Sequence, residues 1–278
     1  MGTTAHASPP PDFAHLLVSA DGPRGTLTLN RPEALNALSN EVMAEVIAAC
    51  GWFDHQPDVR VVVVSGAGRA FSAGADLSAF LPATGDTPSP AGGRVPGDTG
   101  RLMADALERM APVAIARLHG HVVGGGLVLA AACDLRVAAD DVRFSIPEVD
   151  LGIPLAWGGI PRLVREIGPA LTKELVMTCR PFGAAEAQAA GFLNRVVPVA
   201  ELDAAVDELA EAVAARPRFA VQATKAHTNA VTSQMVGLSR SWGDAEGLAA
   251  GLRDDEGRAA REAYLERVRA SKGTGRGG

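Results

Sequence analysis

The sequence predicts an α/β fold in which short buried strands alternate with helices. Residues 61–64 and 113–116 are apolar at every position, which is typical of strands that are covered on both faces. Each run leads through a glycine-bearing turn into a segment with helical spacing. Because this order of strand, turn and helix repeats, we expect a largely parallel sheet rather than an all-helical or all-strand architecture.

The first elements are a predicted hairpin and a capped helix. Residues 15–20 and 25–29 have the composition of short strands, and an Asp-Gly-Pro turn at 21–23 separates them. A helix is expected over residues 40–53, since apolar side chains recur there at helical spacing. Ser39 stands directly before this helix and is suited to cap its free amides.

The middle of the chain combines an irregular segment with the repeated pattern. Residues 81–100 are rich in Pro, Gly, Ser, Thr and Asp and show no periodicity, so we expect a mobile loop that could act as a lid. A helix at 102–110 and a strand at 113–118 follow. A helix at 125–133 and a strand at 135–138 come after the second glycine-bearing turn.

Beyond residue 160 the sequence predicts mostly helix, interrupted by one short strand at 194–197. The abundance of alanine suits helices that pack closely through small side chains. The predicted helical segments are 161–167, 171–178, 184–190, 202–215 and 256–270.

Composition excludes several classes of protein. The chain has 278 residues, of which 47% are hydrophobic and 21% charged, so it can bury a sizeable core. Its net charge of −6 argues against a general nucleic-acid binder, which needs a basic face. The longest apolar stretch, 122–132, is shorter than the roughly 20 residues of a membrane span, so we expect no membrane association.

The cysteines and the N-terminus indicate the compartment. Cys50, Cys133 and Cys179 lie far apart without a paired spacing, so neither a disulfide framework nor a zinc site is expected. Residues 1–12 have neither the basic nor the apolar region of a signal peptide. We therefore expect a cytoplasmic protein.

Two glycine-bearing turns are the strongest functional signal. The first, at 71–77, reads FSAGADL, and the second, at 119–127, reads HGHVVGGGL. Free backbone amides at a helix start attract negative charge, and small residues leave them accessible. Two such donors that converge on one carbonyl oxygen would stabilise an enolate or an oxyanion.

Each turn also has an ordinary interpretation. The glycines at 124–126 could begin a dinucleotide-binding turn, but they lack the required G-x-G-x-x-G spacing. The first turn could be a plain turn in which Asp76 caps a helix, a role that fits the functional interpretation as well.

Five motifs in a fixed order resemble the crotonase superfamily, the enoyl-CoA hydratase/isomerase family, from about residue 29 to 198. They are LNRPEALNAL at 29–38, AGAD at 73–76, HG through GGG at 119–126, CDLR at 133–136 and IPEVDLG at 146–152. The resemblance implies a crotonase-like spiral of ββα units with a helical C-terminal oligomerisation region. It also implies an acyl-CoA thioester substrate, no cofactor beyond the coenzyme A of the substrate, and a homotrimer or dimer of trimers.

This resemblance divides the chain into four parts. Residues 1–12 are expected to be a flexible N-terminus, and residues 13–200 a crotonase-like acyl-CoA-binding core. Residues 201–270 are the expected helical region, and residues 271–278 a disordered tail.

The resemblance also assigns roles to site residues. The backbone N–H groups of Ala75 and Gly125 would form an oxyanion hole for the thioester oxygen, and Glu148 would be the catalytic base. No metal ligand is expected. The other residues expected to bind substrate are Ala73, Gly74, Asp76, Leu77, Gly124, Val128 and Trp157.

Several of these residues have competing interpretations. Glu148 could be a solvated turn carboxylate, unless an apolar pocket raises its pKa toward neutrality. Trp157 either shortens the acyl pocket or belongs to the core. Arg31 and Arg69 could contact coenzyme phosphates or lie on the surface. His119 is expected to make a structural hydrogen bond rather than to act in catalysis.

One position departs from the family pattern. Val128 stands where hydratases of the family carry a second glutamate, and a valine cannot hold or deprotonate water. A single carboxylate can still carry a proton from one carbon to another, as in the single-glutamate isomerases of the family. The sequence therefore favours enoyl-CoA isomerisation. The alternatives are hydration and a catalytically silent acyl-CoA-binding protein.

Overall fold

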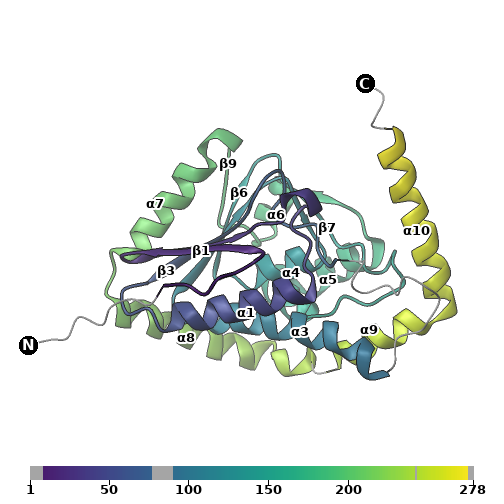
Figure 1. Ribbon diagram of the computed structural model, residues 1–278, viewed down its shortest axis with the longest axis horizontal. Helices are drawn as coiled ribbons and strands as arrows, with labels where there is room; N and C mark the ends of the chain where they lie inside the picture. The colour runs from purple at the N-terminus through teal and green to yellow at the C-terminus, as the bar shows by residue number, and fades with distance from the viewer. Residues whose placement is uncertain (1–8, 77–89, 242, 275–278) are drawn as a thin grey trace, which may run out of the picture.

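The centre of the molecule is a six-stranded sheet with the strand order β1-β2-β3-β4-β6-β9 (Figure 1). The structure, a computed structural model, describes residues 9–76, 90–241 and 243–274. The strands β1 and β2 form the predicted antiparallel hairpin, and the later neighbours pair in parallel. The strands are β1 (Leu16–Asp21), β2 (Arg24–Leu29), β3 (Val61–Gly66), β4 (Val113–Leu118), β6 (Leu135–Ala139) and β9 (Arg195–Val197).

Helices cover the sheet and form most of the C-terminal part. Ser39 caps the first of them as predicted, since its Oγ accepts from Val42 N at 3.3 Å. None of the described helices is long and apolar enough to cross a bilayer. The helices are α1 (Asn40–Asp54), α3 (Pro90–Arg109), α4 (Gly125–Ala131), α5 (Gly159–Thr178), α6 (Ala184–Ala189), α7 (Leu202–Ala214), α8 (Arg218–Met235), α9 (Asp244–Arg253) and α10 (Asp255–Thr274).

Each face of the central sheet has its own core, which explains strands that are apolar at every position. Val61 and Val63 pack with α7 on one face. Val62 and Val64 belong to a larger core with α1, α3 and α4 on the other face (Figure 1). Because successive side chains of a strand point to opposite faces, both sets must be apolar.

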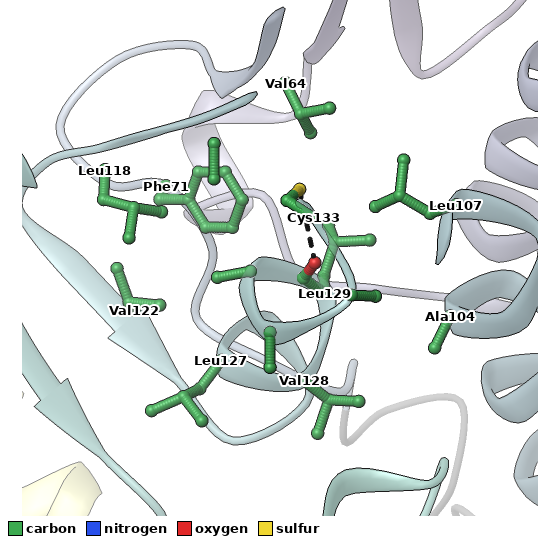
Figure 2. Close-up of a cluster of buried hydrophobic side chains, with 14 of the residues drawn as sticks. Val64, Phe71, Ala104, Leu107, Leu118, Val122, Leu127, Val128, Leu129 and Cys133 are labelled. Carbon is green, nitrogen blue, oxygen red and sulfur yellow. Dashed lines mark hydrogen bonds between the residues drawn. The ribbon is translucent and has the colours of Figure 1, made fainter. Parts of the chain in front are cut away.

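Helix α4 is enclosed by the larger core. All of its residues are buried. Figure 2 shows its side chains surrounded by others from β3, α3 and β5, among them Val64, Leu107 and Val122. The start of this helix therefore places free backbone N–H groups inside the molecule, away from bulk water.

A second, three-stranded sheet positions the loop that carries Glu148. It contains β5 (His121–Val123), β7 (Arg143–Ser145) and β8 (Phe182–Gly183). The chain leaves β5 at Gly124, and it leaves β7 shortly before Glu148. Since β5 and β7 are parallel, their carboxyl ends lie at the same edge of the sheet. Residues 142–145 are strand-like in sequence, whereas β5 and β8, with three and two residues, were not predicted.

The predicted loop at 81–100 is wrong for its second half. Helix α3 begins at Pro90, and only residues 81–89 lie outside the described structure. Proline is tolerated in the first turn of a helix. The later glycines permit close contacts, because a Cβ atom at Gly97 would lie 2.9 Å from Ala245 and one at Gly100 would collide with the ring of Trp157.

The C-terminal part contains more helix than the sequence predicted. Helix α8 was not predicted, and Lys225 is its one buried residue, so the helix makes little contact with the core. Helix α9 was not predicted either. Helix α10 ends at Thr274, so residues 271–274 of the predicted tail are helical, consistent with the low cost of extending an existing helix.

Candidate active site

The two glycine-bearing turns lie side by side. Ser72 N donates to His121 O at 3.2 Å, and Val123 N donates to Ser72 O at 3.0 Å. Gly74 packs directly on the second turn, since a Cβ atom at this position would lie 3.3 Å from Gly125 N. These contacts bring together two segments that are distant in the sequence.

The amides of Ala75 and Gly125 are both available to a ligand. Leu38 N donates to Gly74 O at 2.8 Å and Leu38 O accepts from Asp76 N at 3.0 Å, so the Ala75 N–H faces the opposite side. Gly125 is the first residue of α4, where an amide has no partner in its own helix. Within the described chain neither N–H donates a hydrogen bond, and both residues line one cavity.

Asn36 and Ser72 hold the first turn from behind. The Asn36 side chain is buried, and its Nδ2 donates to Ala67 O and to Ala70 O, each at 2.8 Å. Ser72 Oγ donates to Asn36 O at 2.8 Å and accepts from Gly74 N at 3.2 Å. The two polar side chains thus fix the turn backbone. Their role was missed from sequence, although the LNRPEALNAL and FSAGAD motifs contain them.

The carboxyl group of Glu148 lies against the second turn. Glu148 O accepts from Leu151 N and Ile153 N, each at 3.0 Å, which fixes the loop that carries it. A Cβ atom at Gly124 would collide with Glu148 Oε1, and Gly124 has φ 48°, so this position requires glycine. Oε2 of Glu148 is shielded from solvent and has no hydrogen-bond partner in the described structure.

Burial changes the acid strength of Glu148. Removal of the carboxylate from water raises the pKa of Glu148 to about 7, and a hydrogen bond from its own backbone N–H offsets part of the rise. Among the described residues no Lys or Arg forms an ion pair with it. The group therefore ionises near neutral pH, where it can both accept and return a proton.

The cavity beside these groups is small and mostly apolar. Its volume is about 100 Å³. It is lined by five predicted substrate-binding residues, together with Ala75, Gly125 and Glu148. Those five are Ala73, Gly74, Gly124, Val128 and Trp157.

Trp157 is a wall of the cavity and part of the core at once. Its side chain is buried, and its ring lies between Gly100 of α3 and Gly125 of α4. A Cβ atom at either glycine would collide with the ring. Trp157 therefore belongs to the core and also lines the cavity, while a role in shortening an acyl pocket stays a prediction.

Asp76 is a predicted substrate contact that is not found in the cavity. Asp76 does not line it, and its carboxylate accepts from Arg31 Nη1 at 3.0 Å instead. Asp76 pairs with Arg31 because both side chains are largely shielded from water and their opposite charges neutralise each other. Arg31 is accordingly engaged within the fold, while Arg69 is exposed. Leu77 lies outside the described residues.

His119 has the structural role that was expected. Its Nε2 lies 2.9 Å from Gly68 O, and its Nδ1 lies 3.0 Å from Arg117 Nη1. Burial lowers the pKa of His119. The ring is thus held by neighbours outside the cavity.

The C-terminal helices contribute residues that the sequence did not reveal. Leu248 and Leu252 of α9, with Arg261 and Tyr264 of α10, line the same cavity. The contacts that place these residues join segments that are far apart in the sequence. Arg261 Nη1, for example, donates to Leu151 O. No local pattern could have assigned these residues to the site.

Side chains of the metal-binding type are dispersed. The described residues contain no group of three or more His, Cys, Asp or Glu that could hold a metal ion. The three cysteines are free thiols, and burial raises the pKa of Cys50 to about 12. Such a thiol stays protonated at neutral pH, unlike a metal-binding thiolate.

Comparisons with known proteins identify the family of this chain. The family model described as Enoyl-CoA hydratase/isomerase matches residues 25–272. The protein named "Probable enoyl-CoA hydratase echA8" of Mycobacterium bovis is 39% identical over 190 residues, which cover 68% of this chain and 71% of that protein. A peroxisomal Delta(3,5)-Delta(2,4)-dienoyl-CoA isomerase of Arabidopsis thaliana is 37% identical over 210 residues, 72% of this chain and 75% of that protein.

A solved structure from Thermobifida fusca YX, in complex with CoA, has the same fold. It superposes with a TM-score of 0.69 at 33% identity and covers 82% of this chain and 93% of that one. The predicted crotonase-like fold is confirmed by this similarity. With a family model that matches most of its length, the chain belongs to the enoyl-CoA hydratase/isomerase family of the crotonase superfamily.

Proposed function

We propose that this protein is an enoyl-CoA isomerase that moves a double bond from the 3-position to the 2-position of an acyl-CoA thioester. The observation that carries the proposal is one buried carboxylate beside two free backbone amides. Glu148 is the one carboxylate among the described residues that line the cavity. Ala75 and Gly125 supply the amides.

In the proposed reaction, the two amides bind the thioester oxygen while Glu148 moves one proton. Glu148 removes a proton from C2, and the electron pair passes to the thioester oxygen as a dienolate forms. The dienolate then takes the proton from Glu148 at C4, which leaves the double bond between C2 and C3. Each oxyanion donor of this kind is worth about 10²–10³ in turnover, so the two amides supply a large share of the stabilisation.

The pKa of Glu148 suits both steps. A base must be ionised to remove the C2 proton and must then give that proton back to carbon. A carboxyl group with a pKa of about 7 does both near neutral pH, whereas an ordinary glutamate is a weaker base.

Val128 favours isomerisation over hydration. Its side chain is fully buried and lines the cavity, where it offers only methyl groups. Hydration remains a second candidate, since relatives such as the Mycobacterium bovis protein carry that name. A water molecule would then need a partner other than residue 128, and Tyr264 is a hydroxyl in the same cavity.

Conversion of a 3-enoyl-CoA to its 2-enoyl isomer tests the proposal. Products are separated by chromatography and weighed by mass spectrometry, so that water addition is detected as a separate product. We expect isomerisation, and a loss of roughly 10²–10⁴ in turnover for Glu148→Gln. Asp150→Asn is the matched control, because Asp150 lies in the same loop but pairs with Arg267 at the surface. Equal activity of Glu148→Gln and the wild type would refute the role of Glu148.

We further propose that the chain assembles into a trimer or a dimer of trimers, as the family resemblance implies. Exposed apolar side chains on α8 support an assembly, since Phe219 is 84% exposed and Met235 is 76% exposed. Light scattering at several concentrations would measure the mass. A cytoplasmic location is proposed on the basis of the three free thiols.

A further inference from the structure

The wall of the cavity formed by α10 carries a buried positive charge. Arg261 and Tyr264 both line the cavity, and Arg261 is 7% exposed. The other described lining residues, apart from Glu148, are apolar side chains or small residues. The cavity wall therefore has two polar regions, one at Glu148 and one at Arg261 and Tyr264 of α10.

Arg261 differs from the other buried cations of the described chain in having no carboxylate partner. Arg162 pairs with Asp105 and Glu108, Arg136 with Glu166, and Lys225 with Asp134. No acidic side chain of the described residues lies within ion-pair distance of Arg261. A buried charge without a counter-charge is costly, so this site is incomplete without an anion.

The guanidinium group of Arg261 is instead held by two neutral acceptors. Nη1 donates to Leu151 O at 3.1 Å, and Nη2 donates to Leu252 O at 3.2 Å. These bonds use two of the five N–H donors that a guanidinium group carries. Burial lowers the pKa of Arg261, and the exposed neighbour Glu262 offsets part of that effect. The head group is thus oriented by the backbone and keeps donors for a ligand.

Helix α10, which carries Arg261, packs against the loop that follows Glu148. Gly152 has φ 68°, and a Cβ atom there would collide with the backbone of Gly257 at the start of α10. A Cβ atom at Gly251 would lie 2.8 Å from Gly152 O. The three glycines let α9, α10 and the loop after Glu148 touch backbone to backbone, so Arg261 holds a defined place in the wall.

We propose that Arg261 binds a carboxylate at the far end of a short acyl group, so that the natural substrate is a dicarboxylic acyl-CoA. This inference rests on the proposed function for the thioester end of the substrate. The cavity volume of about 100 Å³ favours a short acyl group. Tyr264 supplies a second donor, because burial and the nearby Asp150 and Glu148 charges raise its pKa and keep its hydroxyl protonated.

Binding of two unreactive thioesters tests the inference separately from catalysis. The probes are glutaryl-CoA and 5-methylhexanoyl-CoA, in which an isopropyl group replaces the terminal carboxylate at equal size. Calorimetry on the wild type is expected to give a preference for glutaryl-CoA of about tenfold or more, since charge-assisted pairing with a buried arginine is strong. Arg261→Gln is expected to lose this preference.

Two further variants control for folding. Arg258→Gln lies on the same helix, is exposed and pairs with Asp255, so it should keep the preference of the wild type. Arg261→Lys keeps the charge and should keep part of the preference. Because each preference is a ratio within one preparation, a reduced amount of folded protein does not alter it.

Either of two results would overturn the inference. The first is equal or tighter binding of 5-methylhexanoyl-CoA to the wild type, and the second is a preference for glutaryl-CoA that survives Arg261→Gln. The isomerisation assay with Glu148→Gln is independent of these measurements. The proposed reaction and the proposed substrate class can therefore fail separately.

Discussion

At the scale of single residues, Glu148 shows how position creates reactivity. No side chain of the described residues forms an ion pair with Glu148, and its Oε2 is shielded from water. Desolvation therefore dominates and raises its pKa to about 7. An acid with a raised pKa destabilises the folded state once it is ionised, and this is the expected cost of the base that we propose.

Because ionised Glu148 destabilises the folded state, Glu148→Gln should have a higher free energy of unfolding than the wild type at high pH. The pKa of Glu148 is raised from 4.5 to about 7, so its favourable contribution is complete below pH 4.5 and is lost as the pH rises through 7. At pH 8 the variant should be more stable than the wild type by about 3 kcal/mol. At pH 4.5 the advantage should disappear. Urea unfolding at both pH values measures this, and a constant difference would contradict the explanation.

Val128 provides a second prediction at this scale. If the missing carboxylate is what prevents hydration, Val128→Glu should add water to a 2-enoyl-CoA, whereas the wild type should not. Val128→Gln has the same size without the charge and is the matched control. The product is identified by its gain in mass of one water. Hydration by the wild type at a comparable rate would mean that another group holds the water.

At the scale of elements, the loop after Glu148 connects the cavity to the C-terminal helices. The loop begins where β7 ends, and Gly152 packs on Gly257 of α10. Arg261 and Arg267 of α10 contact the same loop, through Leu151 O and the Asp150 carboxylate. A region that the sequence assigned to oligomerisation thus supplies part of the cavity wall.

A methyl group at Gly152 should separate these elements. Gly152→Ala places alanine at φ 68° and pushes its Cβ into the backbone of Gly257, so we expect a loss of about 2 kcal/mol or more. Activity should fall as α10 moves away from the cavity. Gly243→Ala is the control, because nothing lies within 4 Å of the added atom. Equal urea midpoints for the two variants would contradict the proposed packing.

At the scale of the whole molecule, buried ion pairs connect the core to the active site. Arg162 of α5 contacts Asp105 and Glu108 of α3 at 2.9 and 2.7 Å. Its Nη1 also donates to Trp157 O and Gly158 O, just before α5 begins. One side chain therefore fixes two helices and the tryptophan that lines the cavity.

Removal of this side chain should be costly. Arg162→Met removes the buried cation that Asp105 and Glu108 share, while Arg101 still pairs with Asp105 at 3.2 Å and Arg165 with Glu108 at 2.8 Å, so we expect a loss of about 2–3 kcal/mol in the free energy of unfolding. Arg109→Met is the control, because Arg109 is 74% exposed and its contact with Asp105, at 4.0 Å, is long. That variant should change stability by less than about 0.5 kcal/mol. Similar losses in both variants would show that burial does not decide the strength of these pairs.

Much of the fold was predictable from local pattern. Apolar runs at 61–64 and 113–116 indicated strands covered on both faces, because each face of the sheet must be apolar. Ser39 indicated a helix start because few residues can accept from free amides. The strands β5 and β8 and helix α8 were not predicted, since β5 and β8 have only three and two residues and α8 buries only Lys225.

The sequence by itself determined the family, the two turns and the identity of the proposed base, because these depend on residue types at fixed spacing. It could not determine that the base is shielded, that Asp76 pairs with Arg31, or that Arg261 enters the cavity wall. Those properties depend on contacts between segments far apart in the chain. A side chain becomes buried and gains charged neighbours only when such segments pack together, so only the tertiary structure could decide these three properties.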